Sequence, residues 1–347
     1  MTGPNQPSQD SSTPSSRVSR RRFLGSATSA TAGVAAGVAA GMPIFASAQE
    51  ASPVAGVPGM GGYVSSLLPS TWDQETDVVV VGSGAAAFAA AVTARQAGAE
   101  VLMLERAANP GGTTLISGSE YWIPNNSKMR AAGKTDPRED ALKYMARLSY
   151  PQLYDPESPT LGLLQHNYDM IATFYDTGYV AVDKFEEWGA LFSRVQPSFG
   201  FSGEPDFADP DYHADLPENK APYGRGINPD PERGGSGAVT VQMQAWTDQN
   251  GVPLLLEHRV LGVYLNSEGA VVGVRVLHGE TELAIRAKKG VVFGTGGFTQ
   301  NPTLALNYLR GPVFAACSVP TCTGDFVDIG QALGAQFGNM NQAWWLQ

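Results

Sequence analysis

Small residues followed by a distant acid form the most chemically informative pattern in this sequence. Gly82 permits a tight turn, Gly84 lets the backbone approach a pyrophosphate, and Ala87 takes a third small place, where a helix packs closely on a strand. Glu105 follows about 20 residues on, where an acid can bind a ribose hydroxyl. The candidates for contact with a dinucleotide are Gly82, Ser83, Gly84, Ala85, Ala86, Glu105 and Arg106. The alternative, an ordinary structural turn, is disfavoured by the complete pattern.

A βαβ unit is predicted to position these residues. Val78–Val81 is a short, β-branched apolar run, typical of a strand buried on both faces. Ala85–Ala97 is rich in Ala and lacks Pro and Gly, which predicts a helix that Gly98 ends. Val101–Leu104 is a second buried strand, which ends at Glu105. The turn therefore lies at a helix N-terminus, whose free N–H groups and partial positive charge attract phosphate.

The composition limits the other classes of function. A chain of 347 residues, 43% of them hydrophobic, is long enough for one large or two ordinary domains. The net charge is −10 and no basic patch indicates nucleic acid, so we expect a soluble protein. Cys317 and Cys322 are the only cysteines, and with four scattered histidines they predict no metal site. Free thiols are favoured over a disulfide, which an exported protein could still form.

The N-terminal segment predicts export. The run from Ser19 to Gly25, SRRRFLG, resembles the twin-arginine signal of bacteria, and a weakly apolar stretch leads to the cleavage-site pattern Ala46-Ser47-Ala48. Residues 1–48 are thus predicted to be a cleaved signal peptide that takes the folded protein to the periplasm or outside the cell. An uncleaved membrane anchor is the alternative, although Ala and Gly make a poor membrane helix. No stable membrane insertion is expected after cleavage, and residues 49–76, rich in Gly, Pro and Ser, are predicted to be a flexible linker.

A second run of glycines and hydroxyls follows Glu105 directly. A plain surface loop is one interpretation of Asn109–Ser119. Alternatively, its hydroxyls and backbone N–H groups line a diphosphate and a flavin ring. The candidates are Gly111, Gly112, Thr113, Thr114, Ser117 and Gly118.

The run GGTTLISGSEYWIPNN, which contains these residues, resembles the GGxTxxSGGxxWxPNN block of 3-ketosteroid dehydrogenases. Those enzymes belong to the flavoprotein superfamily that also holds the fumarate reductases. Ser119 stands where the family has a second Gly. The resemblance implies a Rossmann-like α/β domain that binds FAD, with a parallel sheet, helices, an added β-meander and the start of an inserted α+β capping domain.

Helical apolar spacing recurs in Pro137–Ser149 and Leu161–Trp188. A core-facing stripe explains most of the apolar residues. The resemblance implies one exception, because ketosteroid dehydrogenases carry an active-site tyrosine on a helix shortly before a Gly like Gly189. Tyr175 is the nearest match and is the candidate catalytic residue.

The segment from Ser193 to Gly237 is dense in Pro, Gly, Asp and aromatic residues, as functional or disordered loops are. Its fragment PDYHADLPENKAPYGRGINP resembles a stretch of the same dehydrogenases and is expected to help cover a substrate pocket. Tyr212, His213 and Arg225 are otherwise ordinary loop residues.

The second half of the chain is predicted to return to the dinucleotide. A short helix over Gly237–Asp248 precedes strands separated by turns at Asn266–Gly269 and His278–Glu280, and Val291–Phe293 is a further buried strand. The candidates that the resemblance adds are Val260, through its backbone to the adenine, Thr295, Gly296 and Gly297, and Asp325 of a T-G-D motif in which Phe326 replaces a Gly.

The last residues bear on the substrate. A helix is expected from Asn301 to Arg310. Near the end the chain reads Ala-Trp-Trp-Leu over 343–346, as in ketosteroid dehydrogenases, rather than the Gln-x-His-Pro-Thr run of fumarate reductases. The resemblance therefore favours an apolar substrate over a dicarboxylate.

Together these features predict residues 77–297 as an FAD-binding domain and 298–347 as the incomplete start of a capping domain. The expected activity is FAD-dependent removal of a hydride and a proton from adjacent carbons of a small, apolar, steroid-like ketone, with an unknown electron acceptor. A fumarate-reductase-like protein that reduces an unsaturated acid and an inactive, truncated flavin-binding fragment are the alternatives.

Overall fold

The computed structural model describes residues 64–195, 211–230, 232 and 237–343. The predicted signal peptide, residues 1–48, and the first part of the predicted linker lie outside these ranges, as do the tryptophans at 344 and 345.

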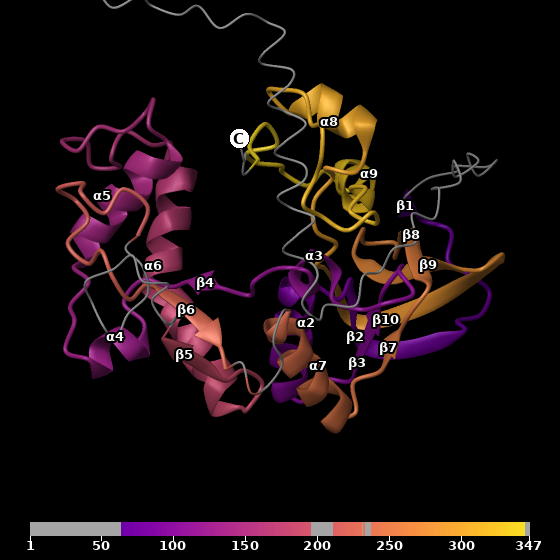
Figure 1. Ribbon diagram of the computed structural model, residues 1–347. Coiled ribbons are helices and arrows are strands. Elements are labelled where there is room, and N and C mark those ends of the chain that lie inside the picture. Colours follow the sequence, from indigo (N-terminus) through magenta and orange to yellow (C-terminus); the bar gives the residue numbers. More distant parts are fainter. Residues whose placement is uncertain (1–63, 196–210, 231, 233–236, 344–347) are drawn as a thin grey trace, which may run out of the picture. The chain divides into compact units, whose positions relative to one another are not determined.

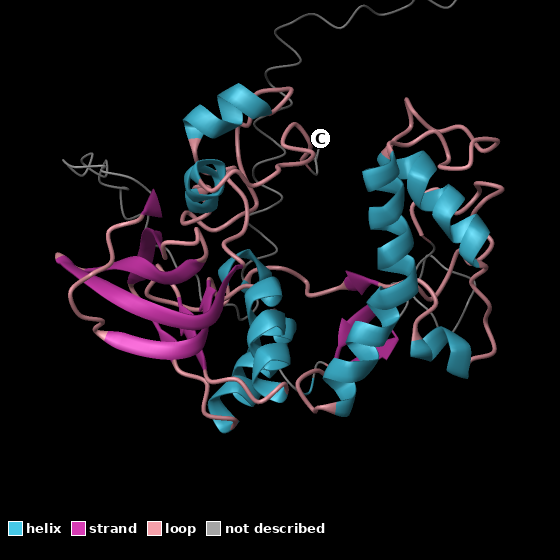
Figure 2. Ribbon diagram, turned by 180° about the vertical axis from the view of Figure 1, so that it is seen from behind, coloured by secondary structure: helices cyan, strands magenta, loops and turns pink. Residues whose placement is uncertain are grey.

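A seven-stranded sheet carries the predicted βαβ unit (Figures 1 and 2). Its strands are β1 (Val64–Ser65), β2 (Gln74–Val81), β3 (Val101–Leu104), β7 (Leu254–Leu255), β8 (His258–Leu265), β9 (Val271–His278) and β10 (Thr281–Phe293). Their order is β1-β8-β9-β10-β2-β3-β7. The strands β10, β2, β3 and β7 are parallel, whereas β8, β9 and β10 form the predicted antiparallel meander. The α/β fold class is thus confirmed.

Alternation along the central strands places apolar side chains on both faces of the sheet. Val80 and Met103 pack on one face in a cluster with Phe88 of α2 (Ala85–Gln96) and Met243 of α7 (Ala238–Gln249). Their neighbours in β2 and β3 point to the opposite face, as successive strand residues do, and pack against the meander. Both faces of β2 and β3 are therefore buried, as their continuous apolar sequences predict.

Two strand boundaries differ from the predictions. Val291–Phe293 is not a separate buried strand, because β10 continues through a register shift at Ala287/Gly290 from the meander to a parallel pairing with β2, and Val292 is 42% exposed. The linker prediction also differs from residue 64 on. Strand β1 pairs with β8, β2 begins at Gln74 rather than Val78, and the carboxylate of Asp73 accepts a hydrogen bond from the N–H of Ala284.

The segment between β3 and α7 forms helices and a second sheet. Its elements are α3 (Gly112–Leu115), β4 (Tyr121–Trp122), α4 (Ser127–Ala131), α5 (Arg138–Ser149), α6 (Gln165–Glu187), β5 (Ser193–Val195) and β6 (Gly226–Pro229). Helices α5 and α6 match the predicted helices. The three-stranded sheet, in the order β4-β6-β5, was not predicted. Its strands are only two to four residues long, and β5 and β6 lie in a stretch whose composition is that of a loop.

Two helices follow the main sheet. Asn301 caps the N-terminus of helix α8 (Pro302–Tyr308), and its side chain accepts hydrogen bonds from the N–H groups of Thr303 and Leu304. Helix α9 (Asp325–Ala332) places Ile329 in the cluster that covers the meander. The predicted domain boundary at residue 297 stays a prediction. Among the described residues, no helix has the length and apolarity needed to cross a membrane.

Candidate functional site

A cavity of about 390 Å³ lies at the carboxyl ends of the parallel strands. Val81, Leu104 and Phe293, the last residues of β2, β3 and β10, all line it. This edge is where ligands bind in open α/β sheets. All of the predicted cofactor-binding residues line the cavity except Gly111, Ser117, Gly118 and Gly297.

The predicted phosphate-binding turn lies between β2 and α2. Gly82 adopts a φ of +104°, and a Cβ there would lie 2.4 Å from the carbonyl oxygen of Gly294. At Gly84 a Cβ would meet only Thr114 Oγ1, at 3.7 Å, so that its Cα faces open space in the cavity. Gly84 gives α2 no side-chain cap, and the first turn of α2 holds no acidic residue. The helix N-terminus therefore presents its N–H groups to an anion.

Ser83 and Glu105 link the turn to the strand that carries the predicted ribose site. Ser83 Oγ donates a hydrogen bond of 2.6 Å to Glu105 Oε2 and accepts one of 2.8 Å from the N–H of Gly111. Glu105 Oε1 accepts a further bond of 2.8 Å from the N–H of Ala107. Each carboxylate oxygen keeps a lone pair for a hydroxyl group. Gly111, although outside the lining, thus helps to orient the acid.

The second glycine run approaches the first. A Cβ on Gly112 would lie 3.9 Å from the Cα of Gly84. Thr114 Oγ1 accepts a bond of 3.2 Å from the N–H of Ala85, and Thr113 Oγ1 lies 3.4 Å from the Sγ of Cys322. The run therefore forms a wall of the cavity, in helix α3, and the interpretation as a plain surface loop is wrong.

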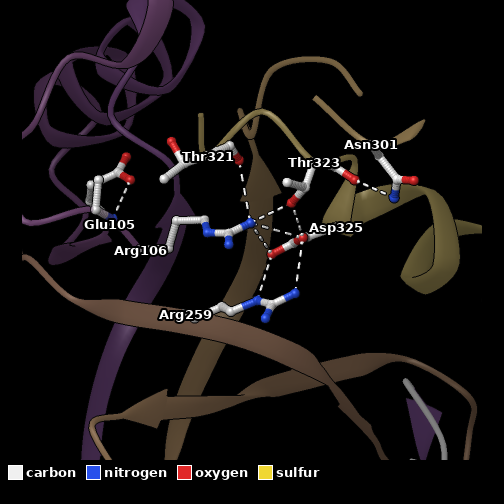
Figure 3. A network of polar contacts seen from close by, with 8 residues as sticks. Glu105, Arg106, Arg259, Asn301, Thr321, Thr323 and Asp325 are labelled. Carbon is white, nitrogen blue, oxygen red and sulfur yellow. Dashed lines mark hydrogen bonds and ion pairs between the residues drawn. The ribbon is translucent and has the colours of Figure 1, made fainter. Parts of the chain in front are cut away.

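Asp325 lies at the centre of a charged network on another wall (Figure 3). Arg259 binds its carboxylate with two hydrogen bonds, from Nε at 2.9 Å and Nη2 at 3.2 Å, and Nη1 of Arg106 lies 3.1 Å from both oxygens. The hydroxyl of Thr323 donates a bond of 2.8 Å to the same group. Burial lowers the pKa of the Arg106 guanidinium, and the Asp325 charge opposes that shift. Arginine stays protonated throughout, so the network is ionic.

Sequence reasoning missed several lining residues. His258, Arg259 and Cys322 all line the cavity. Phe326 stands where the family has Gly, and its ring packs against that of Phe293 in a tilted arrangement, with the ring centroids 4.8 Å apart. Arg259 directly precedes Val260, which was predicted, and no spacing rule distinguishes it from other arginines. Within the described residues, no group of three His, Cys, Asp or Glu side chains could hold a metal ion.

Ser119 is buried and strained. It adopts a φ of +62°, a conformation that favours glycine, which explains the family's Gly at this place. The residue is 5% exposed, and among the described residues its Oγ has no hydrogen-bond partner.

Replacing Ser119 with glycine is therefore expected to stabilise the folded chain. Glycine adopts the left-handed conformation without strain and removes an unpaired hydroxyl. Together these gains exceed the cost of the higher conformational entropy of the unfolded chain by about 1 kcal/mol. Urea unfolding of Ser119→Gly and Ser119→Ala separates the two effects, because alanine removes only the hydroxyl. A lower free energy of unfolding in both variants would contradict the account.

Tyr175 does not join the cavity lining. Its side chain is buried in a cluster with Tyr144 and Leu163, and its hydroxyl donates to the backbone carbonyl of Asp136. Burial, and then the charge of Asp136, raise the pKa of the Tyr175 hydroxyl, whereas a proton-abstracting tyrosinate needs a lowered one. In this structure Tyr175 packs as a core residue, and its catalytic role stays a prediction.

The other loop candidates also lie outside the cavity lining. Tyr212 is 75% exposed, whereas Arg225 is completely buried between acidic side chains. Arg225 is thus not the ordinary loop residue that the composition of its segment predicted.

The parallel sheet, the uncapped helix and the acid that ends β3 are together typical of a dinucleotide-binding α/β protein. The sequence pattern of the FAD binding domain family matches residues 77–346, and the chain belongs to this family. FAD is therefore the cofactor, and the geometry fits it. Gly84 leaves room for phosphates, Glu105 is oriented for hydroxyl groups, and the N-terminus of α2 is open.

Relatives of known activity share this region. The chain is similar to 4-oxocyclohexanecarboxylate 2-dehydrogenase of Sinomonas cyclohexanicum, with 30% identity over 302 residues, which cover 78% of this chain and 51% of the relative. It is also similar to 3-oxosteroid 1-dehydrogenase of Mycolicibacterium smegmatis, with 28% identity and coverage of 78% and 56%. Fumarate reductases are also among its relatives.

A solved structure shares the fold. The 3-ketosteroid-Δ4-(5α)-dehydrogenase of Rhodococcus jostii, in complex with 4-androstene-3,17-dione, superposes with a TM-score of 0.63 at 25% identity, covering 78% of this chain and 56% of that one. The chain spans about half the length of the curated relatives it matches.

Proposed function

We propose that the chain is the flavin-binding part of a dehydrogenase that removes two hydrogens from adjacent carbons of a cyclic ketone. The observation that carries the proposal is the cavity, which is lined by the residues that are predicted to bind the phosphates and the ribose of the cofactor. The substrate class is supported by the relatives, two of which are named for oxidation of a ring that bears a ketone.

FAD, when bound, supplies the acceptor for a hydride from one carbon, while the neighbouring carbon loses a proton. The described residues of this chain contribute binding and orientation. Ser83 and Gly111 fix the carboxylate of Glu105 for the ribose, and the N-terminus of α2 offsets phosphate charge. Arg106 and Asp325 face the same cavity.

Absorption spectroscopy and turnover test the proposal in turn. The purified chain is mixed with FAD and desalted, and a retained flavin band is expected. The loaded protein is then assayed for oxidation of a 3-oxosteroid and of 4-oxocyclohexanecarboxylate with an artificial electron acceptor. Reduction of fumarate is assayed separately with an artificial electron donor. Oxidation of a ring ketone supports the proposal. Reduction of fumarate without oxidation of a ring ketone supports a fumarate-reductase-like protein instead. A colourless protein indicates a fragment that does not hold the cofactor.

Thiol labelling offers a readout of FAD binding that needs no turnover. Cys322 is 6% exposed and lines the cavity, whereas Cys317 is exposed. Iodoacetamide is expected to modify Cys317 quickly and Cys322 slowly, and FAD is expected to slow the reaction of Cys322 alone. Mass spectrometry of the two peptides measures both rates. Equal protection of both cysteines, or protection of neither, would contradict the placement of FAD in this cavity.

Export by the twin-arginine route remains part of the proposal, supported by the SRRRFLG run and the Ala46-Ser47-Ala48 pattern. Replacement of Arg20 and Arg21 by lysine is expected to keep the protein in the cytoplasm of a bacterial host. Cell fractionation and N-terminal sequencing of the exported protein check this expectation. An unchanged distribution would contradict it.

A further inference from the structure

One wall of the cavity comes from a single segment near the end of the described chain. Val319, Thr321, Cys322, Asp325, Phe326 and Ile329 all line the cavity, and all precede or belong to α9. The turn after β2 and the end of β3 line the cavity as well. The width of the cavity therefore depends on how this segment is held against the strands.

Apolar contacts hold the later part of the segment. Val327 and Ile329 are 7% and 1% exposed, and the ring of Phe326 packs against that of Phe293 of β10. The earlier part, Thr321–Gly324, has polar contacts instead. Asn301 Nδ2 donates a bond of 3.0 Å to the carbonyl of Thr323, and Nη1 of Arg106 lies 3.3 Å from the carbonyl of Thr321.

The Asp325 carboxylate connects this segment to two different strands. Arg259 belongs to β8, and Arg106 follows β3, so the two guanidinium groups reach Asp325 from separate elements (Figure 3). The side chains of Arg106, Arg259 and Asp325 are 25%, 33% and 16% exposed, so the network is only partly screened by water. Asp325 is also the first residue of α9, where a negative charge is favoured by the helix dipole.

We propose that Arg259 is a positioning residue for flavin binding. It acts through Asp325, by holding the start of α9 and the preceding turn where they close the cavity around FAD. The inference rests on the proposed function in that FAD is the ligand whose affinity it sets. The two-bond geometry of Arg259 needs the planar guanidinium, so lysine replaces it only in part.

The full chain with Arg259→Gln is compared with the wild type in FAD titrations, followed by quenching of flavin fluorescence. The dissociation constant of Arg259→Gln for FAD is expected to be roughly tenfold higher than that of the wild type, which is a typical coupling energy for two residues in contact. The dissociation constant of Arg259→Lys is expected to lie between those of the wild type and Arg259→Gln. Arg286→Gln is the matched control. It removes the same charge from the same sheet, breaks an exposed ion pair with Glu75 and lies outside the cavity lining.

A double-mutant cycle distinguishes positioning from direct contact. If Arg259 acts through Asp325, then Arg259→Gln has little further effect in a chain that already carries Asp325→Ala. Additive losses would show that Arg259 contacts FAD independently and would overturn the proposal. An unchanged dissociation constant in Arg259→Gln would overturn it as well.

Hydrogen exchange of the flavin-free protein separates failure of this inference from failure of the proposed function. Arg259→Gln is expected to speed exchange of the amides of 325–332, and Arg286→Gln is not. If the wild type fails to retain FAD, the proposed function fails, yet faster exchange in Arg259→Gln still supports the positioning contact. Unchanged exchange overturns the contact whatever the flavin result.

Discussion

Replacing Gly82 with alanine is expected to abolish FAD binding and to lower the stability of the folded chain. A Cβ at this position would lie 2.4 Å from the carbonyl oxygen of Gly294 and 2.9 Å from its carbon, both backbone atoms that cannot rotate away. The φ of +104° adds a conformational penalty of about 1–2 kcal/mol, and the steric overlap costs roughly 1–3 kcal/mol more.

The neighbouring strands leave the turn no room to adapt. The N–H of Gly82 donates a bond of 2.7 Å to the carbonyl of Leu104, and the N–H of Gly294 donates one of 2.8 Å to the carbonyl of Val81. The turn is therefore fixed to β3 on one side and to the end of β10 on the other. A shift that relieved the overlap would break these bonds and move the N-terminus of α2 away from the phosphates.

Gly84→Ala is the matched control, because it adds the same methyl group two residues later. There the new Cβ would meet only Thr114 Oγ1, at 3.7 Å, which is ordinary contact. We expect the melting temperature of Gly84→Ala to stay within a few degrees of the wild type, while its FAD affinity falls because the methyl group fills space in the cavity. Thermal unfolding and flavin titration measure both effects. An unchanged melting temperature in Gly82→Ala would contradict the described turn.

The contrast between these glycines shows what the sequence could predict. The βαβ unit is local, because the turn, the helix and the acid lie within Asp77–Arg106, and each follows from spacing and composition. The sequence could place Gly82, Gly84 and Glu105 in one site. It could not show that Gly82 is constrained by Gly294, since that contact joins residues that lie far apart in the chain.

The charged wall and the candidate tyrosine illustrate the same limit. Arg259 and Asp325 meet only because β8 and α9 pack together, and a single arginine gives no spacing pattern that would reveal this. Tyr175 had the right residue type on a correctly predicted helix. Helical periodicity places a side chain on a face, but the packing of α5 and α6 decides what that face contacts.

Replacing Arg225 is expected to produce the largest loss of stability outside the cavity. Its side chain is 0% exposed and binds Asp136 through Nε and Nη2, at 2.9 and 2.7 Å, and Asp211 through Nη1 at 2.7 Å. Its guanidinium also lies over the rings of Trp122 and Tyr144, at 5.2 and 5.1 Å. Arg225→Met keeps much of the volume but leaves two buried carboxylates without a cation, which costs about 3–5 kcal/mol.

The loss of stability in Arg225→Met is expected to depend on pH. Burial raises the pKa of Asp211, and the charge of Arg225 opposes that shift only in part. A carboxyl whose pKa is higher in the folded than in the unfolded state stabilises the fold at low pH, and this contribution is lost as the pH rises through the folded-state pKa. Without Arg225 the opposing charge is gone. The difference in stability between wild type and Arg225→Met is therefore expected to grow as the pH rises from about 4 to 7.

Urea unfolding of the two proteins at several pH values measures this difference. Trp122 Nε1 and Arg225 Nη1 donate to different oxygens of Asp211. Asp211→Asn is the informative companion, because its one amide oxygen can still accept from Arg225 while the excess negative charge is removed and the bond from Trp122 is lost. We expect Asp211→Asn to be near neutral or stabilising at pH 7, within about 1 kcal/mol, since the Asp136–Arg225 pair remains. A loss in Asp211→Asn as large as that in Arg225→Met would contradict the assignment of Asp211 as the surplus charge. A pH-independent loss in Arg225→Met would show that packing against Trp122 and Tyr144, rather than charge, is what Arg225 provides.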